Sequence, residues 1–160
     1  MEIRVGQGFD VHSFCIGRPL ILGGVKIEHP KGLEGHSDAD VLLHAITDAL
    51  LGAAGLEDIG NLFPNTDQAW KDADSGHLLK IAWQKISGLG WEIVNLDCSL
   101  LMEEPKISPY RSQILVSIAE ILVLKTTQCN LKATTMEGMS FIGRKEGIMA
   151  SCVCLLKKEA

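Results

Sequence analysis

Three side chains near the start of the chain could together hold a metal ion. Asp10 and His12 are two residues apart, so in an extended backbone both side chains project to the same side. His44 supplies a second imidazole further along the chain. Two imidazoles and one carboxylate, with a fourth position left open, form the ligand set of a catalytic zinc site. The alternative is three unrelated polar residues, because an Asp-x-His pattern is short and common.

A second candidate is the segment His36-Ser37-Asp38, which lies just before an amphipathic stretch. Backbone N–H groups at the N-terminus of a helix attract anions, and phosphate groups bind readily there. Ser37 could instead be an ordinary helix N-cap. His36 could donate a hydrogen bond to a phosphate or simply contact water.

Two further regions combine polar residues with glycine. One contains Asp58–Gly60 and Phe63–Asp67, and ordinary turns would explain both segments equally well. The other is Thr134–Gly138, followed by Phe141 and Arg144. Hydroxyls and a carboxylate at a strand end could bind phosphate oxygens and a hard cation such as Mg²⁺. A loop with a capping glutamate is the alternative there.

Hydrophobic periodicity predicts the elements that must position these residues. A helix is expected over Asp38–Leu51, capped by Ser37 in a capping box with Asp40, and with Asp40, His44 and Asp48 on its polar face. The segment Leu56–Ala73 is expected to be long and irregular. The other expected elements are a strand over Glu2–Gly6, a hairpin of Leu20–Leu22 and Val25–Ile27, helices over Ser75–Ser87 and Ser108–Leu124, and strands over Trp91–Met102, Leu131–Thr135 and Ile148–Leu156.

The strand patterns also predict the arrangement of the sheet. Alternation in Trp91–Met102 places Val94 on the same face as Leu96 and Cys98. Ile148–Leu156 is apolar on both faces, which predicts a central position. Strands that alternate with helices indicate an α/β (α+β) fold. We therefore expect one domain over residues 1–160, with a mixed, mostly covered β-sheet and helices packed on it.

The composition limits the classes of partner. The chain has 160 residues, 46% of them hydrophobic, and its 15 basic and 20 acidic residues give a net charge of −5. This acidic excess argues against nucleic acid or an anionic membrane as a partner. No stretch has the apolar length of a membrane span. The five cysteines lack paired CxxC motifs, which predicts reduced thiols in a cytosol-like compartment, although Cys152 and Cys154 could form a thiolate pair.

Taken together and in order, these segments resemble one family, the 2-C-methyl-D-erythritol 2,4-cyclodiphosphate synthases of the non-mevalonate isoprenoid pathway. The resemblance runs nearly from end to end and rests on Gly8–His12, Gly35–Asp40 with His44, Asp58–Gly60, Phe63–Asp67, Ala133–Thr135 with Glu137, and Gly143-Arg144 with Glu146-Gly147. It implies a phosphorus–oxygen lyase that converts 4-diphosphocytidyl-2-C-methyl-D-erythritol 2-phosphate to the cyclic diphosphate and CMP by intramolecular phosphoryl transfer. It also implies cytoplasmic location in a bacterium, or a plastid-type organelle after removal of a transit segment.

The resemblance assigns roles to individual residues. Asp10, His12 and His44 match the ligands of one zinc ion per chain, and Glu137 matches a ligand of a second divalent ion, Mg²⁺ or Mn²⁺. His36 and Thr135 match residues that position the phosphates and support the transition state. The substrate-binding positions of the family match Ser37, Asp58, Ile59, Gly60, Phe63, Pro64, Asn65, Thr66, Asp67, Met102, Pro105, Lys106, Ile107, Ser108, Ala133 and Thr134.

The family assembles as a homotrimer with active sites at subunit interfaces and a central cavity that can bind an isoprenoid diphosphate. Phe141 and Arg144 match the residues that line this cavity. The sequence departs from the family pattern at Met136, where a third threonine is usual, and at Ile142, Lys145 and Ser151.

Two other functions are consistent with the same residues: a zinc phosphoesterase that uses water as nucleophile, and a non-catalytic, zinc-stabilised trimer that binds an isoprenoid diphosphate.

Overall fold

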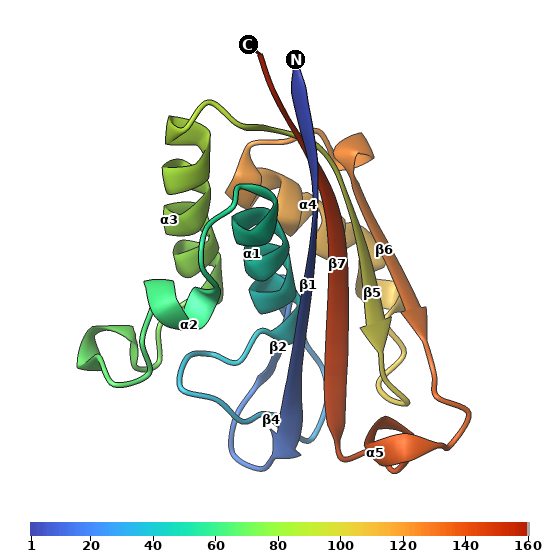
Figure 1. Ribbon diagram of the computed structural model, residues 1–160. Helices are drawn as coiled ribbons and strands as arrows, with labels where there is room; N and C mark the ends of the chain where they lie inside the picture. The colour runs from blue at the N-terminus through green and yellow to red at the C-terminus, as the bar shows by residue number, and fades with distance from the viewer. Residues whose placement is uncertain (160) are drawn as a thin grey trace.

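A five-stranded mixed β-sheet is the framework of the structure, a computed structural model that describes residues 1–159 (Figure 1). The strands lie in the order β4-β1-β7-β5-β6. Neighbouring strands are antiparallel except β5 and β6, which are parallel. Their bounds are β1 Glu2–Cys15, β4 Gly32–Leu33, β5 Glu92–Leu101, β6 Cys129–Thr134 and β7 Gly147–Lys158. A separate hairpin pairs β2, Leu20–Leu22, with β3, Val25–Ile27, as the sequence predicts.

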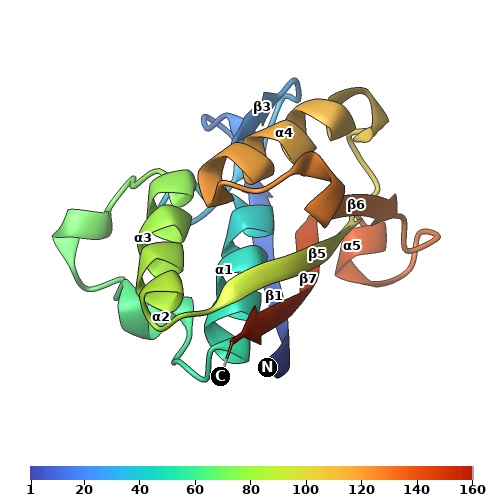
Figure 2. The same cartoon turned by 90° about the horizontal axis from the view of Figure 1, so that it is seen from above.

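The long helices α1, α3 and α4 all lie on one side of this sheet (Figure 2). The helices are α1 Val41–Ala53, α2 Ile59–Leu62, α3 Ser75–Gly88, α4 Arg111–Leu122 and α5 Ser140–Gly143, with 3₁₀ turns η1 Gln68–Trp70, η2 Ser108–Tyr110 and η3 Thr126–Gln128. Helix α1 packs directly against β1 and β7, and almost all its apolar side chains are buried. None of the helices within residues 1–159 is both long enough and apolar enough to cross a membrane.

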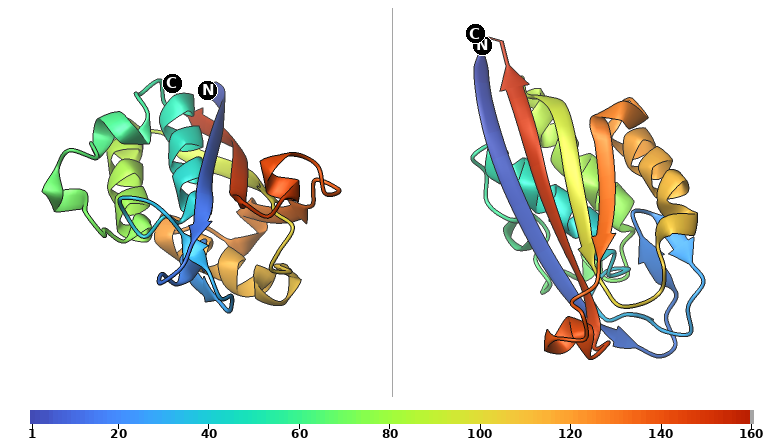
Figure 3. Two further views of the ribbon diagram at one scale, coloured as in Figure 1. Left: turned by 90° about the horizontal axis from the view of Figure 1, so that it is seen from below. Right: turned by 90° about the vertical axis from the view of Figure 1, so that its right-hand side faces the viewer.

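The opposite face of the sheet carries no long helix (Figure 3). On this face of β1 the side chains of Val5 and Phe9 are 68% and 52% exposed, and Ile3 and Val11 are similarly exposed. The prediction of a mostly covered sheet is therefore wrong for a single chain. The prediction that the last strand is central is confirmed, because β7 lies between β1 and β5. Its apolar residues on both faces meet α1 on one side and join an open apolar surface on the other.

Two strand predictions need correction. The sequence predicts a first strand over Glu2–Gly6, whereas β1 continues to Cys15 because it pairs with β7 along almost its whole length. The predicted face of Val94 is also wrong. A β-bulge between Ile93 and Asn95 shifts the register there, so Val94 is 37% exposed instead of buried. The helix predicted over Ser108–Leu124 begins as η2 and ends with α4 at Leu122.

The start of α1 differs from the predicted capping box. The N-cap is Asp40 and not Ser37, and Asp40 is fully buried instead of lying on the polar face. One oxygen of Asp40 accepts hydrogen bonds from Leu43 N at 3.0 Å and Gly23 N at 2.9 Å. The other accepts from Gly24 N at 2.7 Å. The same carboxylate thus caps α1 and fastens the β2–β3 turn to it.

Replacing Asp40 by alanine should lower the free energy of unfolding by about 3 kcal/mol, because it removes the cap and leaves three N–H groups without a partner. Asp40→Asn is the matched control. Asparagine keeps one oxygen for Leu43 and Gly23 and loses only the bond from Gly24, so we expect a loss of about 1 kcal/mol. Chemical denaturation measures both values, and equal stability of the two variants would contradict the capping role.

The pH dependence of stability supplies a second measurement on Asp40. Burial raises its pKa from 3.8 to about 6, although the backbone N–H groups act in the opposite direction. The folded protein therefore binds this proton more tightly than the unfolded chain does. The contribution of Asp40 to stability is then largest below about pH 4 and decreases as the pH rises to about 6. This part of the profile should flatten in Asp40→Asn.

Candidate metal centre

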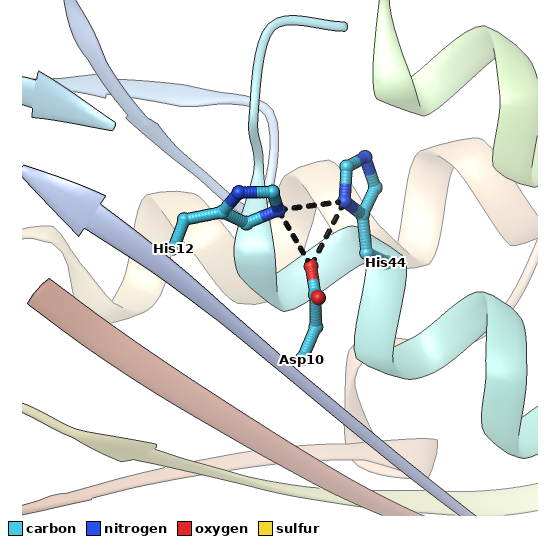
Figure 4. A group of neighbouring side chains, drawn as sticks. All are labelled: Asp10, His12 and His44. Atoms are coloured by element: carbon cyan, nitrogen blue, oxygen red, sulfur yellow. Dashed lines mark hydrogen bonds and ion pairs between the residues drawn. The ribbon is translucent and has the colours of Figure 1, made fainter. Parts of the chain in front are cut away.

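Asp10, His12 and His44 converge on one point between β1 and α1 (Figure 4). Asp10 Oδ2 lies 2.8 Å from His12 Nε2 and 2.9 Å from His44 Nδ1, and the two nitrogens are 3.3 Å apart. A tetrahedral zinc ion with bond lengths of about 2.0–2.1 Å would hold its ligands about 3.3 Å apart. Within residues 1–159 no other group of His, Cys, Asp or Glu side chains comes together in this way. The three residues therefore fit a metal ion.

The outer nitrogens of both rings are held by neighbouring groups. His12 Nδ1–H donates to the carbonyl oxygen of Glu34 at 2.6 Å, which leaves the lone pair on Nε2 directed at the centre. His44 Nε2 lies 2.8 Å from Ser75 Oγ, and that hydroxyl donates to Asp38. Because Ser75 uses its proton on Asp38, it accepts the proton of His44 Nε2, and Nδ1 of His44 keeps its lone pair. Both imidazoles are thus oriented as metal ligands.

The electrostatics of the centre favour a positive charge. Burial by itself would raise the pKa of Asp10, but hydrogen bonds and charges from His12 and His44 outweigh it and lower that pKa to about 2. Burial by itself would lower the pKa of His12, but Asp10 outweighs it and raises that pKa above 6.5. Three electron-rich atoms in contact require a cation between them, either a proton or a metal ion.

A cavity of about 340 Å³ opens from this centre. Its lining residues are Asp10, His12, Gly35, His36, Ser37, His44, Ile59, Gly60, Phe63, Asn65, Trp70 and Leu78. The predicted binding residues Pro64, Thr66, Asp58 and Asp67 do not line it. Asp58 and Asp67 instead cap α2 and η1 through Asn61 N and Ala69 N. The sequence interpretation missed Trp70, whose ring packs edge-on against Phe63 at 4.9 Å, although an aromatic residue in a polar segment is a usable signal.

His36 lies in the wall of this cavity and has an unpaired polar atom. Its Nε2 is buried and has no hydrogen-bond partner among the described residues. The backbone on either side of His36 is fixed, since Arg18 donates to the carbonyl oxygens of Gly35, at 2.6 Å, and Ser37. A buried polar atom without a partner is costly, so His36 is suited to contact a polar ligand in the cavity.

A second pocket, of about 260 Å³, lies at the ends of β5 and β6. Its lining residues are Met102, Glu103, Pro105, Lys106, Ile107, Ser108, Ala133, Thr134 and Thr135. All the predicted binding residues of this region therefore share one pocket, together with Glu103 of the same segment and Thr135. The two pockets have no lining residue in common. A single chain thus does not bring Thr135 to His36.

The remaining predicted residues lie beyond both pockets. Glu137 follows Thr135 and is exposed, and it lines neither cavity. Phe141 is 41% exposed on α5. Arg144 is exposed and pairs with Glu146 at 2.7 Å. These three residues are near one another in sequence and open to solvent in one chain.

The chain is similar to known proteins over almost its whole length. The model of the YgbB family matches residues 3–157, almost the whole chain. The chain belongs to the YgbB family. It is 56% identical over 156 residues to the 2-C-methyl-D-erythritol 2,4-cyclodiphosphate synthase of Shouchella clausii, with 98% of each chain covered.

Solved structures of similar proteins share the fold. The bifunctional IspDF of Campylobacter jejuni matches with a TM-score of 0.95 and 47% identity, over 99% of this chain and 43% of that one. IspF of Plasmodium falciparum, solved as a complex with CDP, matches with a TM-score of 0.87 and 35% identity, over 99% of this chain and 97% of that one.

Proposed function

We propose that this chain catalyses formation of 2-C-methyl-D-erythritol 2,4-cyclodiphosphate and CMP from 4-diphosphocytidyl-2-C-methyl-D-erythritol 2-phosphate. The observation that carries the proposal is the triad of Asp10, His12 and His44 opening into a cavity, in a chain 56% identical to a synthase of that name. In this reaction an oxygen of the 2-phosphate forms a bond to the β-phosphorus. The bond from that phosphorus to the oxygen bridging to the α-phosphate breaks, and CMP leaves.

The main task of the protein is to bring two anionic groups together. Positioning and charge neutralisation account for most catalysis of phosphoryl transfer. The net charge of −5 opposes binding of such a substrate, so local positive charge is needed. When bound, zinc at the triad and Mg²⁺ or Mn²⁺ at Glu137 would supply that charge to phosphate oxygens.

The side chains of the cavity hold the substrate in place. His36, with its unpaired Nε2, donates to a phosphate oxygen, and Ser37 lies beside it. Phe63 and Asn65 contact the methylerythritol phosphate. The smaller pocket, with Lys106 among its residues, takes the cytidine.

The complete active site forms between two subunits of a homotrimer. Two arguments support this: the two pockets of one chain share no residue, and one face of the sheet leaves Val5, Phe9 and Val11 exposed. Burying such a surface against a second copy removes apolar area from water. Thr135 and Glu137 of one subunit would then face His36 of the next. Phe141 and Arg144 would line a central cavity that can take an isoprenoid diphosphate.

The direct test is incubation of the purified protein with the diphosphocytidyl substrate and Mg²⁺. We expect CMP and the cyclic diphosphate in equal amounts. We also propose that the enzyme is located in the cytoplasm of a bacterium. A linear phosphate product would indicate a zinc phosphoesterase. No turnover by a trimer with fully loaded metal sites would indicate a non-catalytic protein that binds isoprenoid diphosphate.

Replacing Glu137 by glutamine should slow the reaction about a hundredfold at limiting Mg²⁺ and leave zinc content unchanged, because it removes one charge from the second ion site. The measurement is a Mg²⁺ titration of the rate. Glu120→Gln, which alters an exposed glutamate of α4, is the control. An unchanged Mg²⁺ titration in Glu137→Gln would refute the assignment.

A further inference from the structure

Glu103 lines the smaller pocket, but its carboxylate is bound to the loop that follows β6. Its Oε1 accepts a hydrogen bond from Met136 N at 2.8 Å. Beside it, Met102 N donates to the carbonyl oxygen of Thr134 at 3.0 Å. Two successive residues after β5 therefore hold the chain on both sides of Thr135.

The loop held by Glu103 has an unusual backbone. Glu137 and Gly138 both have positive φ, 53° and 74°. A left-handed conformation is unfavourable for a residue with a side chain, so neighbouring contacts must maintain it at Glu137. Besides the bond that Glu103 accepts from Met136 N, the turn has one donated by Glu137 N to Thr135 Oγ1 at 3.3 Å, which is a weak contact. The thioether of Met136 has no donor, so its backbone N–H is the only group of that residue that can donate to Glu103.

The neighbouring carboxylate, that of Glu104, has different partners from that of Glu103. Glu104 is 43% exposed in its side chain and pairs with Lys145 at 2.8 Å and His29 at 3.5 Å. It does not line the pocket and it does not contact Met136. The two adjacent glutamates therefore offer a matched pair, one directed at the loop and one at surface cations.

We propose that Glu103 is a positioning residue: it fixes the turn that carries Thr135 and Glu137 relative to the nucleotide pocket. The inference rests on the proposed function, which gives Glu137 to the second metal ion and the pocket to cytidine. Because Glu103 acts as an acceptor through one oxygen, its charge is not required. The geometry therefore separates the effect of alanine, which removes the acceptor, from that of glutamine, which retains it.

The experiment compares Glu103→Ala, Glu103→Gln and Glu104→Ala in the full-length, zinc-loaded protein. The first readout is the hydrogen-exchange rate of the Met136 amide by NMR, and the second is Mn²⁺ affinity in the presence of CDP. We expect exchange about tenfold faster and Mn²⁺ affinity about tenfold weaker in Glu103→Ala, since a hydrogen bond to a carboxylate is lost. Glu103→Gln and Glu104→Ala should resemble the wild type, and zinc content should be equal throughout.

Three results would overturn the proposal. Unchanged Met136 exchange in Glu103→Ala would remove the contact on which it depends. Weak Mn²⁺ binding in Glu103→Gln with slow Met136 exchange would mean that the charge itself contacts metal or nucleotide. If the wild type binds no Mn²⁺ with CDP, the role of Glu137 in the proposed function fails and the positioning role fails with it, whatever the Met136 exchange shows.

Discussion

Replacing His44 by alanine should yield a folded protein that neither retains its metal ion nor turns over substrate. The residue is one of the three side chains that fit a metal ion, and its Nδ1 lies 2.9 Å from Asp10 and 3.3 Å from His12. If about 10–16 kcal/mol of zinc binding is shared among three protein ligands, losing one weakens affinity by about 300-fold to several thousandfold. The apolar side chains that fasten α1 to the sheet are unchanged, so the fold should persist.

The measurements are zinc content after dialysis, thermal unfolding and the rate of CMP release. His29→Ala is the control, because His29 is also largely shielded, with a side chain 8% exposed, but packs against Phe14 and does not belong to the triad. It should retain zinc and activity. Normal zinc content and near-normal turnover in His44→Ala would exclude the ligand assignment.

Acid should release the metal from the wild type. The imidazole of His12 must lose its proton to bind an ion, and Asp10 raises its pKa above 6.5 even though burial acts in the opposite direction. Proton competition therefore begins above the pH at which an ordinary histidine would protonate. The zinc affinity, measured by competition with a chelator, should fall as the pH decreases through this range, and an affinity independent of pH down to pH 5 would argue against His12 as a ligand.

Only part of the ligand triad could be predicted from local geometry. Alternation along an extended strand places Asp10 and His12 on one side whatever the rest of the fold. The helical pattern put His44 on the polar face of its helix, so its contact with the strand followed only from the resemblance to the family. The length of β1 could not be predicted in this way. It depends on pairing with β7, from Glu2 opposite Lys158 to Ser13 opposite Gly147, which is a contact between the two ends of the chain.

The burial of polar side chains could not be predicted from the local sequence pattern either. Asp40 reads as a surface residue of a helix, yet it is fully buried because its partners Gly23 and Gly24 belong to a turn more than fifteen residues earlier. The supporting hydroxyl of Ser75 likewise comes from another helix. The open face of the sheet shows the opposite limit: apolar residues on both sides of β7 predict burial, but within residues 1–159 no long helix covers the second side.

Replacing Gly8 by alanine should damage both the fold and the metal centre. A Cβ at Gly8 would lie 2.1 Å from the carbonyl oxygen of Ala45 and 2.6 Å from the amide nitrogen of Ala49, both backbone atoms of α1 that cannot rotate away. Helix α1 must therefore move away from β1. Overpacking of this kind costs about 1–3 kcal/mol.

The same displacement acts on the ligands, because Gly8 is two residues before Asp10 on β1 and Ala45 follows His44 on α1. The close approach that glycine allows at position 8 is thus what brings the third ligand within 2.9 Å of Asp10. A shift of about 1 Å at a site of this kind costs about a hundredfold in rate. We expect Gly8→Ala to unfold at lower denaturant concentration, bind zinc more weakly and turn over about a hundredfold more slowly.

Gly52→Ala provides the control within the same helix. A Cβ at Gly52 would meet no atom within 4 Å, and alanine favours helix over glycine by about 1 kcal/mol, so this variant should be at least as stable as the wild type with normal zinc content. The stability and zinc affinity of the two variants are measured by their denaturant midpoints and by zinc titration. If Gly8→Ala matched Gly52→Ala in both, the spacing of α1 and β1 would not be what holds His44 against Asp10, and the third ligand would have to be positioned by Ser37 and Ser75 alone.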